Sequence, residues 1–406
     1  MSPEVAYFQV DLVLPPDHPV SGFARRAPNA PRLGPSRCRV RVVFLRTGGR
    51  SLAWVLGDFL YFPDHLAQNL RRWWRQTDGI DAFIFGGTHT HGGPELGFLR
   101  RHEPHLDVQE DLFRQLITAL PKTPAWQPVR LDYLHHTFSP PLSAGRRVHV
   151  LGRALRLVNP RYPVHDLLNG LKITPHDGDP ILIVSYASHP VFHRHPSASA
   201  DYIGAVEDRL PNARLLLFPG FGGDVRPHYP ARRRASVGAL LRGGRFLKLV
   251  FGRDFRPYDR AAFDDFVHRL RAGLQRAHSK PLAPTLAVRT LEFDHSLRGT
   301  HPDDTKQLRT VLWSFGRTVW VGVAAEVFSA YADRLRRRFP HGRFICTGCL
   351  NHCVGYLPTP NALRYRGYET HEAPRWNGMH GPFDPKSVQG YEVLLYASVA
   401  QLLEGQ

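Results

Sequence analysis

Short apolar runs that end directly in polar, chemically active side chains limit how this chain can fold. Four of these runs read as buried strands: residues 81–85, 181–187, 214–218 and 318–323. Segments with helical periodicity alternate with them, at residues 63–74, 111–120 and 259–279. Such alternation indicates an α/β fold, in which ligands bind beyond the strand ends. We therefore predict a mixed β-sheet core flanked by helices.

Two histidines follow the first of these strands. The run Gly86-Gly-Thr-His-Thr-His-Gly-Gly-Pro94 places His89 and His91 at the strand exit. In an extended chain, residues i and i+2 point to the same side, so both imidazoles can face one small volume. Imidazole at this spacing suits a zinc site with one position open for water. The alternative is that both histidines are simply polar residues of a loop.

The remaining three strands also end in side chains that can bind a metal or move a proton, which are His189, Asp224 and Glu326 in chain order. A carboxylate is common at a helix N-terminus because the helix dipole favours it, and helical periodicity starts again at Val327. Glu326 nevertheless lies at a strand exit like the others. The sequence thus predicts one shared metal site at the C-terminal ends of the strands.

Two stretches rich in arginine interrupt this pattern. Residues 139–172 contain many Pro, Gly and Arg residues, including Arg146, and we predict a long functional loop there. Residues 230–257 are either a basic flap near the site or a solvated insertion. We favour the solvated insertion, because charge runs usually face water.

The bulk composition is that of a folded, soluble protein. Hydrophobic residues make up 42% of the 406 residues and charged residues 22%. The net charge of +18 attracts anions without identifying a partner, and no pattern of a known nucleic-acid-binding module accompanies it. We find no secretory signal and no apolar run long enough to span a membrane. A cytoplasmic enzyme with a single domain over residues 1–406 is therefore the expectation.

Three of the four cysteines cluster at Cys346, Cys349 and Cys353. Their spacing superficially resembles a thiolate site for zinc or an iron–sulfur cluster, but a fourth thiolate is not nearby in the sequence. We expect buried structural cysteines instead, since free cysteine usually packs as a small hydrophobe.

Taken in order, these motifs resemble the catalytic domain of the neutral ceramidase family of zinc-dependent amidases, over essentially the whole chain. The matching motifs are Asp11 with the prolines beyond it, Gly22, Thr88-His89-Thr90-His91-Gly92-Gly93-Pro94, Ser188-His189-Pro190 with Asp201, Gly223-Asp224-Val225, Glu326, Gly355-Tyr356 and Tyr368-Glu369. The ordered set is more specific than any one motif.

The resemblance implies roles for several residues. It implies that zinc is bound by His89, His189, Glu326 and Tyr356. His91 would lie beside the metal, Arg146 would match an active-site arginine of the family, and Tyr368 would stabilise the oxyanion. Beyond the resemblance, our own hypothesis is that His91 or Asp224 carries the proton.

Two departures from the family pattern bear on the substrate. Ceramide-cleaving members carry a serine after Gly-Asp-Val, whereas this chain has Arg226. A guanidinium cannot attack a carbonyl, so covalent catalysis by a serine at this position is excluded. Arg226 either binds a carboxylate or phosphate of the substrate or pairs with an acid such as Asp224. The immunoglobulin-like domain and secretion signal of the family are also not found, which weighs against ceramide itself as substrate.

The sequence therefore supports two main hypotheses. The first is a zinc-dependent hydrolase in which metal-activated water cleaves an amide bond of a small or amphiphilic, anionic N-acyl substrate. The second, motivated by Arg226, is a ceramidase-like binding or accessory protein without catalysis. Binding of specific nucleic acid ranks below both hypotheses.

Overall fold

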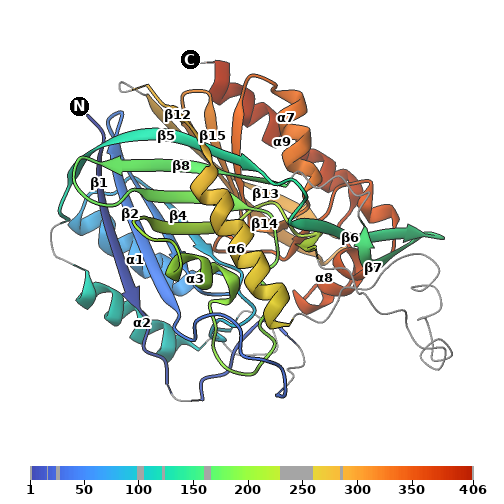
Figure 1. Cartoon of the computed structure of the whole chain (residues 1–406). Coiled ribbons are helices and arrows are strands. Elements are labelled where there is room, and N and C mark those ends of the chain that lie inside the picture. Colours follow the sequence, from blue (N-terminus) through green and yellow to red (C-terminus); the bar gives the residue numbers. More distant parts are fainter. Residues whose placement is uncertain are drawn as a thin grey trace.

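Among the residues that the computed structural model describes, the largest sheet has nine strands (Figure 1). The described residues are 2–15, 17–23, 28–97, 105–120, 124–159, 166–228, 259–283 and 287–404. The strand order is β10 (Arg214–Pro219), β9 (Ile181–Tyr186), β8 (Leu167–Pro175), β5 (Gln127–Thr137), β1 (Glu4–Asp11), β2 (Arg39–Thr47), β3 (Arg50–Gly57) and β4 (Ala82–Gly87), with β12 (His278–Pro281) paired to β5. The pairs β9–β10 and β3–β4 are parallel and the others antiparallel, so the sheet is mixed.

The described residues also form three smaller sheets. A four-stranded sheet has the order β13 (Val288–Arg298), β14 (Thr305–Phe315), β15 (Thr318–Val323) and β17 (Arg343–Thr347). A three-stranded sheet contains β11 (Val225–Pro227), β6 (Ser143–Val150) and β7 (Arg153–Asn159). A short parallel pair joins β16 (Glu326–Val327) to β18 (Tyr356–Leu357).

A core of aromatic side chains joins the nine-stranded sheet to the four-stranded sheet. Trp54 of β3 contacts Trp313 and Trp320, with ring centroids 4.9 and 5.6 Å apart, and Phe218 of β10 lies 5.6 Å from Trp320. All four side chains are fully buried. Edge-to-face packing of buried aromatic rings contributes about 0.5–1.5 kcal/mol per pair beyond the area that is buried. This packing holds the two sheets against each other.

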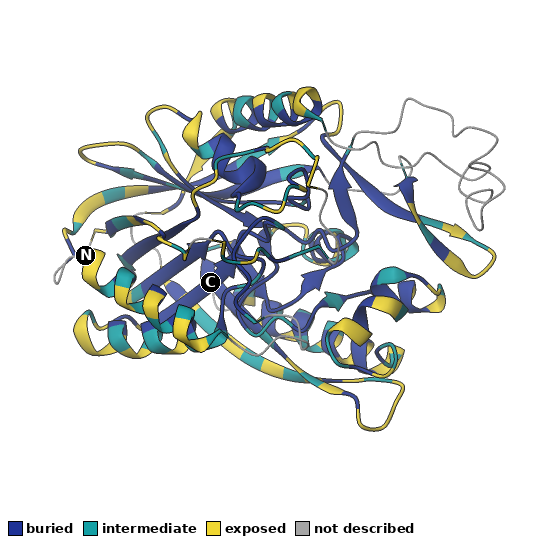
Figure 2. Cartoon of the chain, turned by 90° about the horizontal axis from the view of Figure 1, so that it is seen from below, coloured by how far each residue is buried: buried dark blue, intermediate teal, exposed yellow. Residues whose placement is uncertain are grey.

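The helices cover the outer faces of the sheets, and their outward sides are exposed (Figures 1 and 2). Their bounds are α1 (Asp64–Thr77), α2 (Leu106–Ala119), α3 (Asp201–Asp208), α6 (Arg260–Arg276), α7 (Ala330–Arg338), α8 (Ala373–Trp376) and α9 (Pro385–Glu404), with short turns at Ala362–Arg364 and Tyr368–Glu372. Leu66, Leu70 and Trp74 form the buried face of α1, which packs with strands β1 to β4. Phe263, Phe266 and others of α6 pack with α3 and strands β5, β8 and β9.

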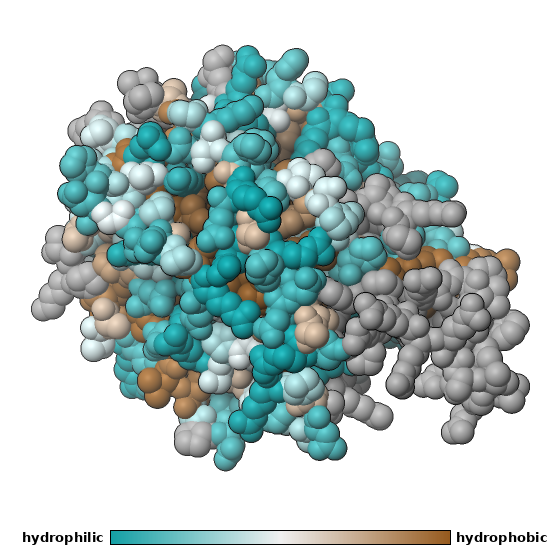
Figure 3. Space-filling view, viewed as in Figure 1, coloured by the Kyte–Doolittle hydropathy of each residue, from teal (hydrophilic) through white to brown (hydrophobic). Residues whose placement is uncertain are grey.

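The outer surface is largely hydrophilic in the view of Figure 3, including the length of α6. Among the described residues, no helix is both long and apolar enough to cross a membrane.

The predicted α/β fold with a mixed sheet flanked by helices is confirmed, whereas the predicted loop at residues 139–172 is wrong. The described residues of that stretch, 139–159 and 166–172, include β6, β7 and the first part of β8. The arginines that suggested a loop are buried in β6, because Glu369 from a distant segment pairs with Arg146 and Arg147. The predicted flap or insertion at residues 230–257 lies outside the described residues.

The predicted helix start at Val327 is also wrong. Glu326 and Val327 form the short strand β16, and α7 begins at Ala330. Glu326 is therefore held by strand pairing beside Tyr356, and its backbone N–H donates to the carbonyl oxygen of Gly355 at 2.8 Å.

Candidate metal centre

Three strand exits meet at one buried point. His89 follows β4, His189 follows β9, and Glu326 follows β15. Their relative exposures are 3%, 4% and 5%, and their possible ligand atoms all lie within 4.8 Å of one another. Residues that are far apart in the chain are thus brought together by the packing of two sheets.

The hydrogen bonds of the two imidazoles orient them for metal binding. His89 Nδ1 lies 3.0 Å from the carbonyl oxygen of Leu60, and His189 Nδ1 lies 2.9 Å from that of Val225. A carbonyl only accepts, so each Nδ1 carries a hydrogen, and in the neutral imidazole each Nε2 then presents a lone pair. This tautomer allows both histidines to bind a metal through Nε2.

Both lone pairs point at the same carboxylate oxygen. Glu326 Oε2 lies 3.3 Å from Nε2 of His89 and 3.1 Å from Nε2 of His189. Zinc ligands at about 2.0–2.1 Å from the ion are separated by roughly 3.3 Å in a tetrahedron. The three possible ligand atoms thus converge at the separation that ligands of one ion have, so the donor set fits zinc.

Burial also favours a metal-binding protonation state at His189. Burial, together with the charge of Arg146, lowers the pKa of His189 to about 3. At neutral pH this imidazole is therefore uncharged, as a metal ligand must be.

The backbone around the site is unusual at two positions. His89 has φ of 61°, in the left-handed region that residues other than glycine rarely adopt. A Cβ on Gly223 would lie 2.3 Å from the carbonyl oxygen of Glu326, so only glycine allows this close approach. The fold thus accepts local strain to bring these segments together.

Two tyrosines lie next to Glu326. Tyr356 is paired with Glu326 in the β16–β18 ladder, and its hydroxyl accepts from Arg146 Nη2 at 3.0 Å. Tyr61 donates its hydroxyl hydrogen to Glu326 Oε1 at 2.6 Å. The sequence analysis missed Tyr61. Its only sequence signal is its position shortly after β3, at the same edge of the sheet as the exit of β4.

Arg146 is held in a buried network of its own. Its Nε donates to Glu369 Oε1 at 2.8 Å, and its Nη2 donates to the carbonyl oxygen of Gly223 at 2.8 Å. Arg147 donates to Glu369 Oε2 at 2.7 Å. The sequence analysis identified Glu369 only as part of a motif. The structure shows that its carboxylate holds both arginines. The network places one guanidinium group beside the Tyr356 hydroxyl.

Tyr368 lies next to Tyr356, with their ring centroids 5.9 Å apart. Burial and the charge of Glu326 raise the pKa of Tyr368, although Arg156 over its ring acts in the opposite direction. Its hydroxyl therefore keeps its hydrogen at neutral pH. The ring of His91 lies 5.3 Å from that of His89 and 6.2 Å from that of His189.

Asp224 directly precedes β11, and Arg226 is the middle residue of that strand. The Asp224 carboxylate is fully buried and accepts from the backbone N–H of Ser329, the residue before α7, at 2.8 Å. Asp224 therefore satisfies a backbone N–H group at the start of that helix. Arg226 is 8% exposed and lies opposite Ala144 of β6.

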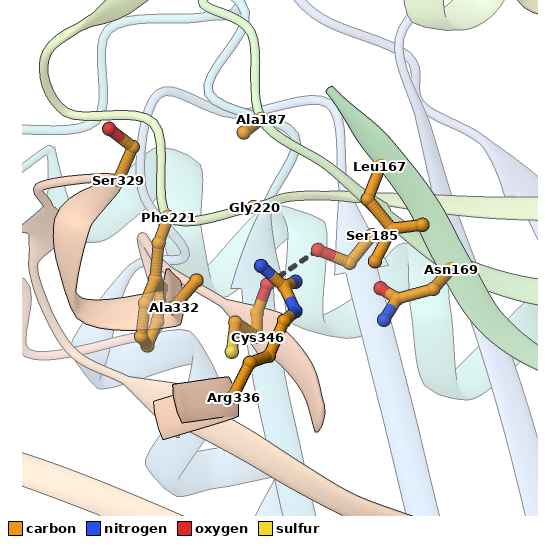
Figure 4. A pocket seen from close by; sticks show the side chains of 10 residues that line it. All are labelled: Leu167, Asn169, Ser185, Ala187, Gly220, Phe221, Ser329, Ala332, Arg336 and Cys346. Carbon is orange, nitrogen blue, oxygen red and sulfur yellow. Dashed lines mark hydrogen bonds between the residues drawn. The ribbon is translucent and has the colours of Figure 1, made fainter. Parts of the chain in front are cut away.

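The cavity at the metal-binding atoms is very small. It measures about 10 Å³ and is lined by residues that include His89, His189, Glu326 and Cys349. A second cavity of about 20 Å³ shares Gly220 with it and includes Ser185, whose hydroxyl donates to the carbonyl oxygen of Cys346 (Figure 4). Spaces of this size hold an ion or one water molecule.

Tyr61 also lines a cavity of about 390 Å³ that is large enough for part of an organic ligand. Leu96, Leu106, Gln109 and His352 contribute to its walls. Through Tyr61, this space lies one side chain away from Glu326.

The cysteine cluster does not form a metal site within the part of the chain that the structure describes. Cys346 and Cys349 are buried thiols and Cys353 is half-buried. The two groups of His, Cys, Asp and Glu side chains there that could hold a metal contain no cysteine.

Comparison with solved structures identifies the architecture. The neutral ceramidase from Pseudomonas aeruginosa superimposes with a TM-score of 0.68 at 14% sequence identity, covering 100% of this chain and 75% of that chain. A ceramidase complexed with C2 superimposes with a TM-score of 0.69 at 14% identity, covering 100% of this chain and 76% of the other. The chain has the neutral ceramidase fold. No protein-family model and no curated protein sequence matches it.

Proposed function

We propose that this ceramidase-like chain is a zinc-dependent hydrolase that cleaves the amide bond of an N-acyl substrate with water. The observation that carries the proposal is the pair of imidazole Nε2 atoms facing one oxygen of Glu326, in the tautomer that binds metals. The structural likeness to solved ceramidases supports amide hydrolysis as the reaction class, since ceramidases cleave an N-acyl amide bond.

Four side chains would hold the ion: His89, His189, Glu326 and Tyr356. Zinc, when bound, polarises a carbonyl group and lowers the pKa of water towards 7. Tyr61 would orient Glu326 through its hydrogen bond, because partners of metal ligands fix the direction of the lone pairs.

Arg146 and Tyr368 would stabilise the negative charge that develops on the amide oxygen. Arg146 is a permanent cation whose direction is fixed by Glu369 and Gly223, so little reorganisation is needed during the reaction. Tyr368 keeps its hydroxyl hydrogen and can donate it to the oxygen. Both groups lie beside Tyr356.

His91 is our choice for the group that moves the proton from water to the leaving amine. Its ring is next to both metal-binding imidazoles, and histidine is the usual acid–base group near neutral pH. Asp224 remains the alternative, but its carboxylate is already engaged with the backbone of Ser329.

Arg226 and the 390 Å³ cavity bear on the substrate. Arg226 would bind a carboxylate or phosphate group, which its fork suits. The cavity beside Tyr61 would receive one arm of the substrate.

Residues 1–406 would act as a single catalytic domain. The competing proposal is an accessory protein of the same fold, which Arg226 at the family's serine position motivates.

Metal content and hydrolysis test the proposal together. Untagged protein should lose one zinc per chain in the variants Glu326→Ala and His89→Ala, and Tyr356→Phe should bind zinc more weakly. The same variants should lose hydrolysis of a panel of N-acyl amines, whereas His341→Ala, a change at an exposed histidine, should retain both. Full hydrolysis by His89→Ala would rule out the metal mechanism. Zinc binding without hydrolysis of any substrate would favour the accessory protein.

A further inference from the structure

Two surface segments meet at one end of the four-stranded sheet. One is the turn that joins β13 to β14, and the other is the segment that precedes α9. The backbone N–H of Thr300 donates to the carbonyl oxygen of Pro382 at 2.9 Å, and that of Asp384 donates to Arg298 at 2.8 Å. The two segments are therefore held in register before any side chain is considered.

Asp304 is the buried centre of this junction. Its side chain is only 2% exposed, and its carboxylate accepts from the backbone N–H groups of His380 and Gly381 at 2.9–3.0 Å. Burial would raise the pKa of Asp304, but these N–H groups and the His380 side chain hold it below its usual value. A carboxylate is thus kept ionised and fixed in direction at neutral pH.

Two imidazoles, those of His301 and His380, lie close to the Asp304 carboxylate. His380 Nδ1 lies 3.0 Å from Asp304 Oδ1, and the ring of His301 lies 4.5 Å from that of His380 at 34°. One possible ligand atom from each of the three residues lies within 4.8 Å of the others. The side chains of His301 and His380 are 44% and 66% exposed, so the open side of the group faces solvent.

We propose that His301, Asp304 and His380 form a second metal site, separate from the catalytic centre, that takes zinc or another divalent transition ion. Two imidazoles and one carboxylate suit such ions, whereas calcium and magnesium prefer oxygen ligands alone. The 3.0 Å between His380 Nδ1 and Asp304 Oδ1 matches the roughly 2.9–3.3 Å expected between neighbouring ligands at about 2.0–2.1 Å from an ion. The exposed side leaves room for water ligands.

The bound ion would join the β13–β14 turn to the start of α9. It would replace the hydrogen between His380 and Asp304 and add His301 to the junction, which links two segments about 80 residues apart in sequence. This site does not depend on the proposed hydrolase function, because none of its residues belongs to the catalytic group.

Counting metal ions separates the two sites. Metal-free, untagged protein is dialysed against zinc, and bound zinc is measured by elemental analysis. Wild type should retain two zinc ions per chain, and the double variant His301→Ala with His380→Ala should retain one. His89→Ala should also retain one, at the second site. His341→Ala, which removes an exposed histidine elsewhere, should retain two.

Thermal unfolding gives a readout independent of activity. Added zinc should raise the melting temperature of His89→Ala, because binding to the folded state stabilises it. It should not raise that of a triple variant that also lacks His301 and His380. Replacing His301 alone should weaken zinc binding at the second site by at least about tenfold. Equal zinc content and equal zinc stabilisation with and without His301 and His380 would overturn the proposal.

Discussion

The buried carboxylate of Glu369 provides the most direct test of how the centre is held. It lies between two guanidinium groups, 2.8 Å from Arg146 Nε and 2.7 Å from Arg147 Nη1, and all three side chains are at most 2% exposed. The variant Glu369→Gln keeps the size of the side chain and removes its charge. Two buried cations then lose their anion, and breaking a buried pair of this kind costs about 3–5 kcal/mol.

The corresponding change in melting temperature follows from the size of the chain. At about 2.1 cal/mol/K per residue, the unfolding entropy of 406 residues is roughly 850 cal/mol/K. A loss of about 3–5 kcal/mol therefore lowers the melting temperature by about 4–6 °C. Scanning calorimetry at one fixed scan rate measures this shift.

An exposed pair of the same chemistry is the matched control. Arg209 and Asp264 are 3.0 Å apart, with side chains 45% and 42% exposed. Asp264→Asn should cost at most about 1 kcal/mol, or roughly 1 °C, because water screens such pairs. Equal shifts in Glu369→Gln and Asp264→Asn would refute the claim that burial makes the Glu369 network important.

The pH dependence of the same difference has a definite sign. Burial alone would raise the pKa of Glu369, but Arg146 and Arg147 lower it below its usual 4.5. A carboxylate with a lowered pKa in the folded state stabilises the protein above the pKa of the unfolded state. The gap between wild type and Glu369→Gln should therefore be complete at pH 7 and shrink as the pH falls below about 4.5.

Three further changes probe the site. Tyr61→Phe removes the hydrogen bond to Glu326 and should weaken zinc binding about tenfold, as measured by competition with a chelator; unchanged affinity would exclude a positioning role. Gly223→Ala should lower the melting temperature and zinc content, because its Cβ would lie 2.3 Å from a carbonyl oxygen, whereas Gly390→Ala, whose nearest contact is at 3.7 Å, should do neither. Arg226→Ser should raise KM by about tenfold or more for N-acyl substrates with a carboxylate but not for neutral ones; an equal effect on both classes would contradict anion binding.

Local patterns were sufficient to predict the core of this fold. The apolar runs at residues 181–187 and 318–323 are β9 and β15, and the amphipathic run after Pro63 is α1. Strands that are buried on both faces appear as continuous apolar runs, and a helix with one buried face appears as a 3.6-residue period. These patterns depend on residues close in sequence, which is why they could be read without the structure.

The features that were missed depend on partners far away in the chain. β6 contains Arg146 and Arg147, and only the distant Glu369 makes their burial in a strand possible. Tyr61 meets Glu326 across 265 residues, so no local pattern indicates their contact. The strand β16 at Glu326 exists because it pairs with β18, whereas its own residues resemble a helix start. The convergence of His89, His189 and Glu326, in contrast, followed from their common position at strand exits.

The main-chain partners of the two imidazoles explain why such a centre is difficult to find by sequence comparison. His89 and His189 are oriented by the carbonyl oxygens of Leu60 and Val225, and any amino acid at those two positions supplies the same acceptor. The residues that aim the ligands can therefore diverge freely while the geometry persists. Main-chain acceptors of this kind place little constraint on the sequence around a site, and this fold matches a solved ceramidase at 14% identity although no protein-family model matches the chain.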